Sequence, residues 1–437
     1  MEIWAILMFV VLLPALLLGY PVAFTLGAIA ILFGTLTVGV EIFALLPYRI
    51  FGIMTNFTLL AVPLFIFMGI ILDKSKVAEE LLESLTKILG RSPGGLAIAV
   101  ILVGAMLAAS TGVVGATVVT LGVIALPTML KHKYDASLAC GTVAASGTLG
   151  QVIPPSIVAI LLADIMGVPV GRMFMGALVP GLFLIGAYIL YIQYLSHRNP
   201  RLAPSFETIA PPNLAALSKA ILPPIALIFA VLGSIFIGIA SPTEAAAVGA
   251  SGALVLAIMR NRLSLSSLRE GAIQATKLTS MVFMILIGAT AFGLVFKALG
   301  GDKLVATFFS SMGVGATGFI LISMAIIFVL GFFLDFIEIC FIVVPIFEPV
   351  ARQLGLDPLW FAILIAMNLQ TSFLTPPFGF SLFYLKAVAP KQIRASHIYN
   401  GVIPFILIQL VALTLIAAFP NTVTWLPDLM DRHNGLL

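Results

Sequence analysis

The 437-residue chain is 61% hydrophobic, has only 22 basic and 18 acidic residues, and has a mean hydropathy of +1.19. Soluble domains carry about 25% charged residues, whereas 9% of this chain is charged, too few to cover a soluble 46.3 kDa protein. The composition excludes a soluble globular protein and predicts an all-α polytopic membrane protein. The net charge of +4 comes from scattered basic residues, so we expect no nucleic-acid partner. Two cysteines, Cys140 and Cys340, and four histidines indicate no disulfide framework, haem or zinc site.

A helix that crosses the bilayer needs about 20 apolar residues. Stretches that reach or approach this length run at 3–18, 21–39, 57–72, 171–196, 220–238, 242–259, 279–298 and 398–419. The first stretch lacks the basic start and the small-residue cleavage site of a signal peptide, so we expect it to be retained. Amphipathic segments between the spans are typical of helices that lie in the membrane interface; they run at Glu41–Met54, Val77–Leu89, Leu265–Lys277 and Lys303–Met312.

Two apolar regions, 95–130 and 317–351, are each long enough for two short helices and have small or polar residues in the middle. This pattern predicts two helical hairpins. Because no water satisfies backbone groups in the bilayer core, we expect such interruptions only where the freed groups find partners.

Two further regions, 136–166 and 358–388, are each one helix length and a half. The first is interrupted by Gly147–Gly150 and Pro154-Pro155, and the second by Thr371-Ser372 and Thr375-Pro376-Pro377. Proline cannot continue a helix but starts one well. The sequence therefore predicts two discontinuous helices.

The two halves of the chain repeat. A shift of 222 positions superimposes Pro127 on Pro349, Asp135 on Asp357, and Pro154-Pro155 on Pro376-Pro377 without a gap. Spans interrupted by Gly or Pro at corresponding positions of two halves are typical of a secondary transporter's binding site. We therefore expect both broken helices to contribute to one translocation site.

The basic residues predict the orientation in the membrane. If the N-terminus is outside and 95–130 enters and leaves on the cytoplasmic side, sixteen Lys and Arg residues are cytoplasmic and six are outside. This distribution obeys the positive-inside rule. The same assignment makes 317–351 enter from the opposite face, so the repeats are inverted and both hairpins are re-entrant.

The predicted organisation has two inverted repeats, 1–196 and 219–420, a cytoplasmic linker at 197–218 and a C-terminal tail at 421–437. The first repeat comprises scaffold helices and an arm (1–94), a hairpin (95–131), a broken helix (135–166) and a further helix (171–196). The second comprises the same parts at 219–314, 315–353, 357–388 and 398–420.

The breaks offer ion-binding chemistry. Freed carbonyl oxygens coordinate cations, and half-helix N-termini attract anions. Asp335 and Glu338 lie in the middle of the second hairpin, and an acid deep in the membrane is a functional candidate. The alternatives are proline kinks whose Ser and Thr residues satisfy the local backbone, and acids that are simply solvated at a wet hairpin tip.

These residues carry a resemblance to a known family. The run Tyr134-Asp135 … Ala145-Ser146-Gly147-Thr148-Leu149-Gly150 … Ile153-Pro154-Pro155-Ser156 resembles the large membrane subunit of tripartite ATP-independent periplasmic (TRAP) transporters. The segments Gly19–Gly27, Ser241–Gly249 and Asn368–Gly379 are similar to it too. The resemblance covers essentially the whole chain. It implies an elevator-type fold like that of the ion transporter superfamily, in the bacterial or archaeal cytoplasmic (inner) membrane.

The resemblance also implies a sodium-coupled secondary active importer of small organic carboxylates, and not an enzyme. Two partners are implied besides the lipid bilayer: a periplasmic substrate-binding protein and a small four-helix membrane subunit. We expect the small subunit to be a separate chain, because this one begins with the first helix of the large subunit. Na⁺ is the implied coupling ion, without a transition metal or an organic cofactor.

Carried over to this chain, the resemblance implies two sodium sites with the solute between them. The first sodium site would comprise Ser110, Thr111, Gly112, Gly147, Thr148 and Gly150. The second would comprise Gly331, Asp335, Thr371, Ser372 and Thr375. The solute site would comprise Ser146, Pro155, Ser156, Asn368, Pro377 and Gly379. One departure concerns the first hairpin tip, which is often Ser-rich in relatives, whereas here Val113 and Val114 follow Gly112.

Other classes of protein are less well supported. A proton-translocating subunit of a respiratory-type complex needs a chain of intramembrane Lys, Glu and His, but the spans hold almost no lysine. The histidines lie at predicted span ends or in loops: His132, His197, His397 and His433. A membrane-embedded transferase or protease needs paired catalytic groups that the sequence does not offer. A one-component symporter built on the same inverted repeat remains the alternative to the tripartite importer.

Overall fold

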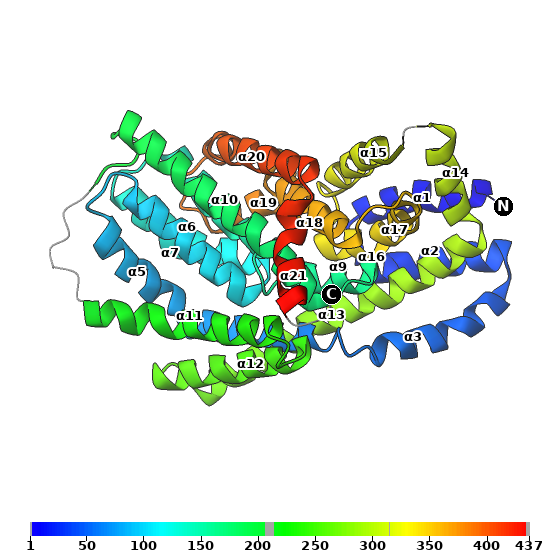
Figure 1. Ribbon diagram of the computed structural model, residues 1–437, viewed down its shortest axis with the longest axis horizontal. Coiled ribbons are helices and arrows are strands. Elements are labelled where there is room, and N and C mark those ends of the chain that lie inside the picture. Colours follow the sequence, from blue (N-terminus) through cyan, green and yellow to red (C-terminus); the bar gives the residue numbers. More distant parts are fainter. Residues whose placement is uncertain (1, 206–213, 314, 434–437) are drawn as a thin grey trace.

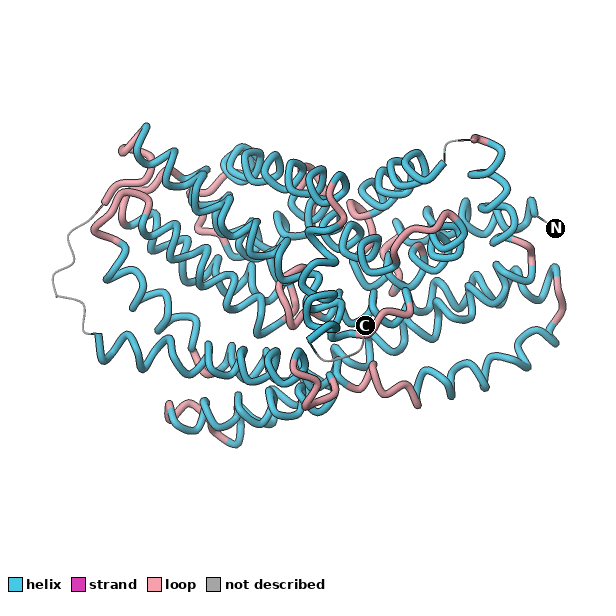
Figure 2. The backbone as a smooth tube through the Cα atoms, viewed as in Figure 1, coloured by secondary structure: helices cyan, strands magenta, loops and turns pink. Residues whose placement is uncertain are grey.

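The computed structural model describes residues 2–205, 214–313 and 315–433, and these residues form helices and loops, with no strand among them (Figures 1 and 2). The predicted all-α fold is confirmed. The first-half helices are α1 (Glu2–Leu17), α2 (Val22–Thr37), η1 (Val40–Leu45), α3 (Leu46–Met54), α4 (Ala61–Lys74), α5 (Val77–Leu89), α6 (Gly95–Thr111), α7 (Val114–Lys131), α8 (Ala136–Thr148), η2 (Leu149–Gln151), α9 (Ile157–Met166) and α10 (Val170–Arg198). The second-half helices are α11 (Leu214–Phe236), α12 (Pro242–Met259), α13 (Leu265–Ala298), α14 (Gly301–Ser311), α15 (Gly315–Leu330), α16 (Phe336–Ile342), α17 (Val344–Gln353), α18 (Pro358–Leu374), α19 (Phe380–Val388), α20 (Ala395–Ala418) and α21 (Asn421–His433).

Five of the described helices are long and apolar enough to cross a membrane by length and composition: α7, α10, α12, α13 and α20. Shorter apolar helices accompany them, including α6, α9, α15 and α18. These four short helices belong to the regions where the sequence predicts hairpins and broken helices. This mixture is typical of a membrane protein with irregular backbone near its functional site.

The helices pack in two groups, which we call the scaffold (α1–α5 and α11–α14) and the core (α6–α10 and α15–α20). In the scaffold, α4 packs along α12 and α13, and α13 packs along α2. In the core, α8 packs against α6, α7 and α20, and α18 packs against α9, α15 and α20. Figure 1 shows α3, α11 and α12 along one long edge of the molecule and α15 and α20 along the other. The two groups meet where α4 contacts α6 and α13 contacts α16.

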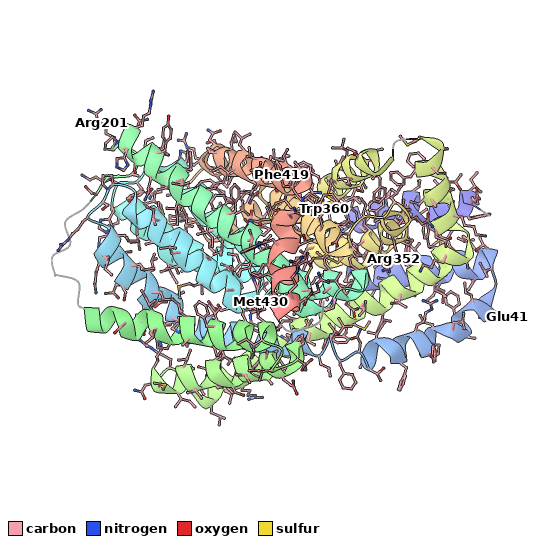
Figure 3. All side chains as sticks on the ribbon, viewed as in Figure 1. Glu41, Arg201, Arg352, Trp360, Phe419 and Met430 are labelled. Atoms are coloured by element: carbon pink, nitrogen blue, oxygen red, sulfur yellow. The ribbon has the colours of Figure 1, made fainter. Side chains whose placement is uncertain are left out.

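Small residues allow the closest helix contacts in the core. A Cβ atom added to Gly141 on α8 would lie 2.0 Å from the carbonyl oxygen of Gly401 on α20. A larger residue at this position would therefore force the two helices apart. Such small-residue contacts are typical of helix packing in membranes. A hydrogen bond of 2.8 Å from Trp360 Nε1 to the carbonyl of Ile416 then joins α18 to α20, and Figure 3 labels Trp360 close to Phe419 at the end of α20.

The hairpins and broken helices lie where the sequence predicts them. The first hairpin is α6 and α7, which turn at Gly112 and Val113. The second hairpin begins with α15, but its returning arm is divided into α16 and α17. Pro345 explains the division, because it has no N–H to donate to the preceding turn. The broken helices are α8 with α9 and α18 with α19.

Two segments differ from the predictions. The prediction of a separate interfacial arm at Leu265–Lys277 is wrong, because this segment and the following span form the single 34-residue helix α13. Lys277, Leu278 and Thr279 include no Gly or Pro that would end a helix there. Parts of the expected linker, residues 206–213, lie outside the described residues.

The other difference is at the C-terminal end, where residues 421–433 of the expected tail form the helix α21. Arg172 on α10 forms ion pairs with Asp428 (2.7 Å) and Asp431 (3.3 Å). Figure 1 shows α21 across the front of the core, beside α10. The helix therefore belongs to the packed structure.

Candidate functional site

The two helix breaks have related local structures. After α8, η2 and a loop lead to α9, and the hydroxyl of Ser156 caps α9 by accepting from the N–H of Ala159 at 3.4 Å. After α18, residues 375–379 are non-helical, and α19 starts at Phe380 without a side-chain cap. Each break holds one Pro-Pro pair, and both Pro-Pro peptide bonds are cis.

The tip of the first hairpin lies against the first break. Gly112 has a φ of +59°, a left-handed conformation that favours glycine. A Cβ at Gly112 would be 3.2 Å from the backbone nitrogen of Ile157 and 3.5 Å from the carbonyl oxygen of Pro155. A Cβ at Gly150 would be 3.5 Å from Ala108 on α6. The structure thus places the first hairpin tip beside the first break, and the first sodium site that the resemblance implies stays a prediction.

The hydroxyls of this region donate to their own helices. Ser110 Oγ and Thr111 Oγ1 both bond the carbonyl of Leu107, at 2.9 and 3.0 Å, and Thr148 Oγ1 bonds the carbonyl of Ala145 at 2.8 Å. A hydroxyl that donates one hydrogen bond keeps oxygen lone pairs for a cation. Gly147 packs tightly on α7, where a Cβ would lie 2.2 Å from Val118 Cγ2.

The second hairpin meets the second break in the same way. A Cβ at Gly331 would lie 2.1 Å from Ser372 Oγ, so the hairpin turn touches α18 directly. The hydroxyls of Thr371, Ser372 and Thr375 each donate to a carbonyl three or four residues earlier, at 2.7 to 2.9 Å. As in the first half, these oxygens keep lone pairs.

Asp335 starts a helix as well as lying in the hairpin turn. Its Oδ1 accepts from the N–H of Phe336 at 2.8 Å, and its own N–H donates to Glu338 Oε2 at 3.0 Å. Asp335 and Glu338 therefore form a capping box at the start of α16. No hydrogen bond joins Asp335 to Thr371, Ser372 or Thr375 among the described residues.

A cavity of about 170 Å³ lies between the two hairpins, and only one predicted site residue, Asp335, lines it. Its scaffold wall consists of Ile66 on α4 and Leu278, Met281 and Val282 on α13. Its core wall consists of Val113, Val114, Gly115, Ile157, Asp335, Phe336, Ile337, Phe373 and Tyr384. The starts of α7, α9 and α16 therefore converge on one space between scaffold and core.

None of the predicted solute residues lines this cavity. Ser156 is next to the lining residue Ile157, but its hydroxyl caps α9 and donates to the carbonyl of Gln151 at 2.9 Å. Asn368 donates to the carbonyl of Met324 at 2.7 Å and so ties α18 to α15. The other predicted residues have packing or loop positions: Ser146 donates to Thr142, Gly379 packs on Phe373, and Pro155 and Pro377 lie in the breaks.

Several lining residues were not foreseen. Val113 and Gly115 follow the Ser-Thr-Gly tip, and a Cβ at Gly115 would lie 3.1 Å from the Tyr384 ring. The hydroxyl of Tyr384 has no hydrogen-bond partner among the described residues. The sequence feature that could have indicated these lining residues is the pair Val113-Val114, which replaces the Ser-rich tip of relatives.

The pair Thr148 and Gln370 lies at the centre of the core. The two positions are 222 residues apart, the offset of the sequence repeat, and Gln370 Nε2 contacts Thr148 Oγ1 at 3.5 Å. Positions related by a two-fold axis meet only on that axis, so this contact supports the inverted repeat. Gln370 Oε1 and both polar atoms of Gln151 are buried without a partner among the described residues.

Two side-chain hydrogen bonds join the scaffold to the core near the ends of α4. Asn56 Nδ2 donates to Asp164 Oδ1 on α9 at 2.7 Å. Thr120 Oγ1 on α7 donates to Asp73 Oδ1 at 2.8 Å. Both bonds lie between side chains that a movement of the core along α4 would separate.

Comparisons with known proteins agree with this architecture. Residues 7–422 match the family model described as "Tripartite ATP-independent periplasmic transporter, DctM component". The C4-dicarboxylate TRAP transporter large permease protein DctM of Pseudomonas aeruginosa is 31% identical over 384 residues, covering 88% of this chain and 89% of the relative. The sialic acid TRAP transporter large permease protein SiaM of Vibrio cholerae is 27% identical, covering 95% and 97%. In fold, the Alcanivorax borkumensis YdaH transporter is similar with a TM-score of 0.63 at 13% identity, covering 93% of this chain and 98% of that one.

Proposed function

Because the chain belongs to the DctM component family of tripartite ATP-independent periplasmic transporters, we propose that it is a sodium-coupled permease that imports an organic acid by an elevator movement. Its relatives are transporter permeases, which points to a transporter and not an enzyme. The family and the apolar helices make it a multi-pass protein of the bacterial inner membrane.

The observation that carries the proposal is the cavity between scaffold and core. One wall comes from α4 and α13, and the other comes from both hairpins and both broken helices. If the core slides along the scaffold wall, solute and ions bound to the core cross the membrane together. The hydrogen bonds Asn56–Asp164 and Asp73–Thr120 would then have to break in each transport cycle.

The proposed sodium ligands suit a hard cation. Na⁺ would use the hydroxyl lone pairs and the backbone carbonyls of the two hairpin–break contacts, because the last carbonyls of an interrupted helix have no backbone N–H of a following helical turn to accept from. In the second site Asp335 would supply the only full negative charge. Its Oδ1 already accepts a backbone N–H, so its other oxygen would face the ion.

The solute's acid group would use a helix start. α7 begins at Val114, its N-cap residue Val113 forms no side-chain cap, and Val114 and Gly115 both line the cavity. The first N–H groups of a helix have no partner within the helix and attract anions. By contrast, Ser156 and Asp335 cap α9 and α16 with their own side chains. An organic acid would therefore bind at the start of α7, beside the first sodium site.

We further propose that two partners complete the transporter, a periplasmic substrate-binding protein and a small membrane subunit. The scaffold arm α3 presents Tyr48 and Phe51, which are 81% and 66% exposed. This apolar surface supports an arm that extends into the membrane, on which a small subunit can pack.

The test is reconstitution into proteoliposomes under an inward Na⁺ gradient. The chain alone should transport negligibly at micromolar solute, and uptake should return when both the small subunit and the binding protein are added. Saturable uptake by the chain alone at this concentration would contradict the tripartite arrangement and favour a one-component symporter.

A further inference from the structure

The cavity between scaffold and core is unusually poor in polar side chains for a site that binds an acid. Of the described residues that line it, only Asp335 and Tyr384 carry a hydroxyl or carboxyl group, and none is basic. We propose that the solute is a short aliphatic monocarboxylate; this inference rests on the proposed function and specifies the substrate class of the same site.

The cavity lining provides no basic side chain that could bind a second carboxylate. A dicarboxylate would place its second carboxylate either among Ile, Leu, Val and Phe side chains or beside Asp335, whose own negative charge already balances the proposed sodium ion. A carboxylate without a cation or hydrogen-bond donors is strongly disfavoured away from water. The start of α7 and the free hydroxyl of Tyr384 provide donors for one acid group, not for two at opposite ends of a molecule.

The cavity lining also provides few hydrogen-bond partners for the hydroxyl groups of a solute. The cavity has a volume of about 170 Å³. A nine-carbon sugar acid would also need a partner in the site for each of its hydroxyls. The lining offers apolar contacts instead, so it favours a compact solute with a hydrocarbon chain.

The scaffold wall of the cavity is apolar. Leu278, Met281 and Val282 on α13 line the scaffold wall of the cavity, and the start of α7 lines its core wall. A carboxylate at α7 therefore directs its alkyl chain toward α13. Each methylene that becomes buried there should raise the affinity about fourfold, until the cavity is full.

The experiment measures binding to the purified complex of this chain and its small subunit, without the binding protein, in Na⁺ buffer. Calorimetry compares acetate, propanoate, butanoate and pentanoate with succinate and N-acetylneuraminate. We expect about a fourfold rise in affinity per methylene from acetate to butanoate, levelling at pentanoate. A flat series, no binding by any monocarboxylate, or tighter binding of succinate or N-acetylneuraminate than of butanoate would overturn the inference.

Two methionines on α13 provide a matched pair of variants. Met281 lines the cavity and Met284 does not, yet their exposed fractions are nearly equal, 44% and 42%. M281A should reduce the gain per methylene, whereas M284A should leave it unchanged. Y384F should weaken binding of the whole series by one constant factor without changing the gain per methylene. Equal effects of M281A and M284A on the series would overturn the proposed position of the alkyl chain.

Uptake by the same complex with its binding protein separates the two proposals. Na⁺-driven uptake of succinate or N-acetylneuraminate, and not of butanoate, would overturn the substrate class and leave the proposed function intact. Failure of every acid to respond to a Na⁺ gradient would overturn the proposed function, whatever the binding series shows.

Discussion

The contact between Gly331 and Ser372 predicts a large effect of a single methyl group. In the variant Gly331→Ala, the new Cβ would lie 2.1 Å from Ser372 Oγ and 2.8 Å from Ser372 Cβ, well inside van der Waals contact. The hairpin turn must therefore move away from α18. Overpacking of this kind costs about 1–3 kcal/mol, and 1.4 kcal/mol is a factor of about ten in an equilibrium constant. We expect the Na⁺ dissociation constant of the variant to rise about tenfold.

The assay is thermal unfolding of the purified protein during a Na⁺ titration at constant ionic strength, because a ligand that binds the folded state stabilises it by mass action. Gly186→Ala is the matched control: Gly186 lies within α10, and no atom would come within 4 Å of its Cβ. This control should bind Na⁺ as wild type does and should be slightly more stable, because Ala favours helix.

A double variant separates packing from ion binding. Ser372→Gly removes both clashing atoms, so in Na⁺-free buffer it should recover most of the stability that Gly331→Ala loses. The Na⁺ affinity of the double variant should remain low, because Ser372 is a proposed ligand. The reasoning is refuted if Gly331→Ala and Gly186→Ala give the same Na⁺ titration.

Three further predictions concern single side chains. Asp335→Asn should weaken the apparent Na⁺ affinity of transport and leave solute capture by the binding protein unchanged; wild-type sodium dependence would remove Asp335 from the site. Arg172→Ala breaks an ion pair with Asp428, which is 40% exposed, and one with Asp431, which is 12% exposed. Hydrogen exchange should therefore accelerate in α21, and unchanged exchange would argue against its anchoring by Arg172. Thr120→Val removes the hydrogen bond to Asp73. The populations of inward- and outward-facing states should then shift in spin-label distance measurements. Distance distributions identical to those of the wild type would contradict the role of this hydrogen bond in joining scaffold and core.

The sequence predicted the breaks and hairpins because their causes are local. Pro154-Pro155 and Pro376-Pro377 interrupt a helix wherever the chain places them, and Gly112 allows a left-handed turn. The same local chemistry brought the first hairpin tip and the first break into the candidate site.

The cavity lining depends on contacts that local chemistry does not encode. Gly115 and Tyr384 are distant in sequence and meet only in the folded core. Met281 lines the cavity because α13 continues unbroken past Lys277. The amphipathic pattern of the first turns of α13 instead suggested a separate helix that ends at Lys277. Ser156 and Asn368 looked like ligands because of their polarity, but their hydrogen bonds serve the helix cap and the α15–α18 contact.

The central claim is that a sodium gradient drives import through the two hairpin–break contacts. The most direct measurement is uptake of labelled organic acid by proteoliposomes that contain this chain and its small subunit, with the binding protein outside and no ATP. We expect uptake under an inward Na⁺ gradient and its loss when an equal K⁺ gradient replaces it. Undiminished uptake in K⁺ would contradict sodium coupling and indicate that protons or another ion drive transport.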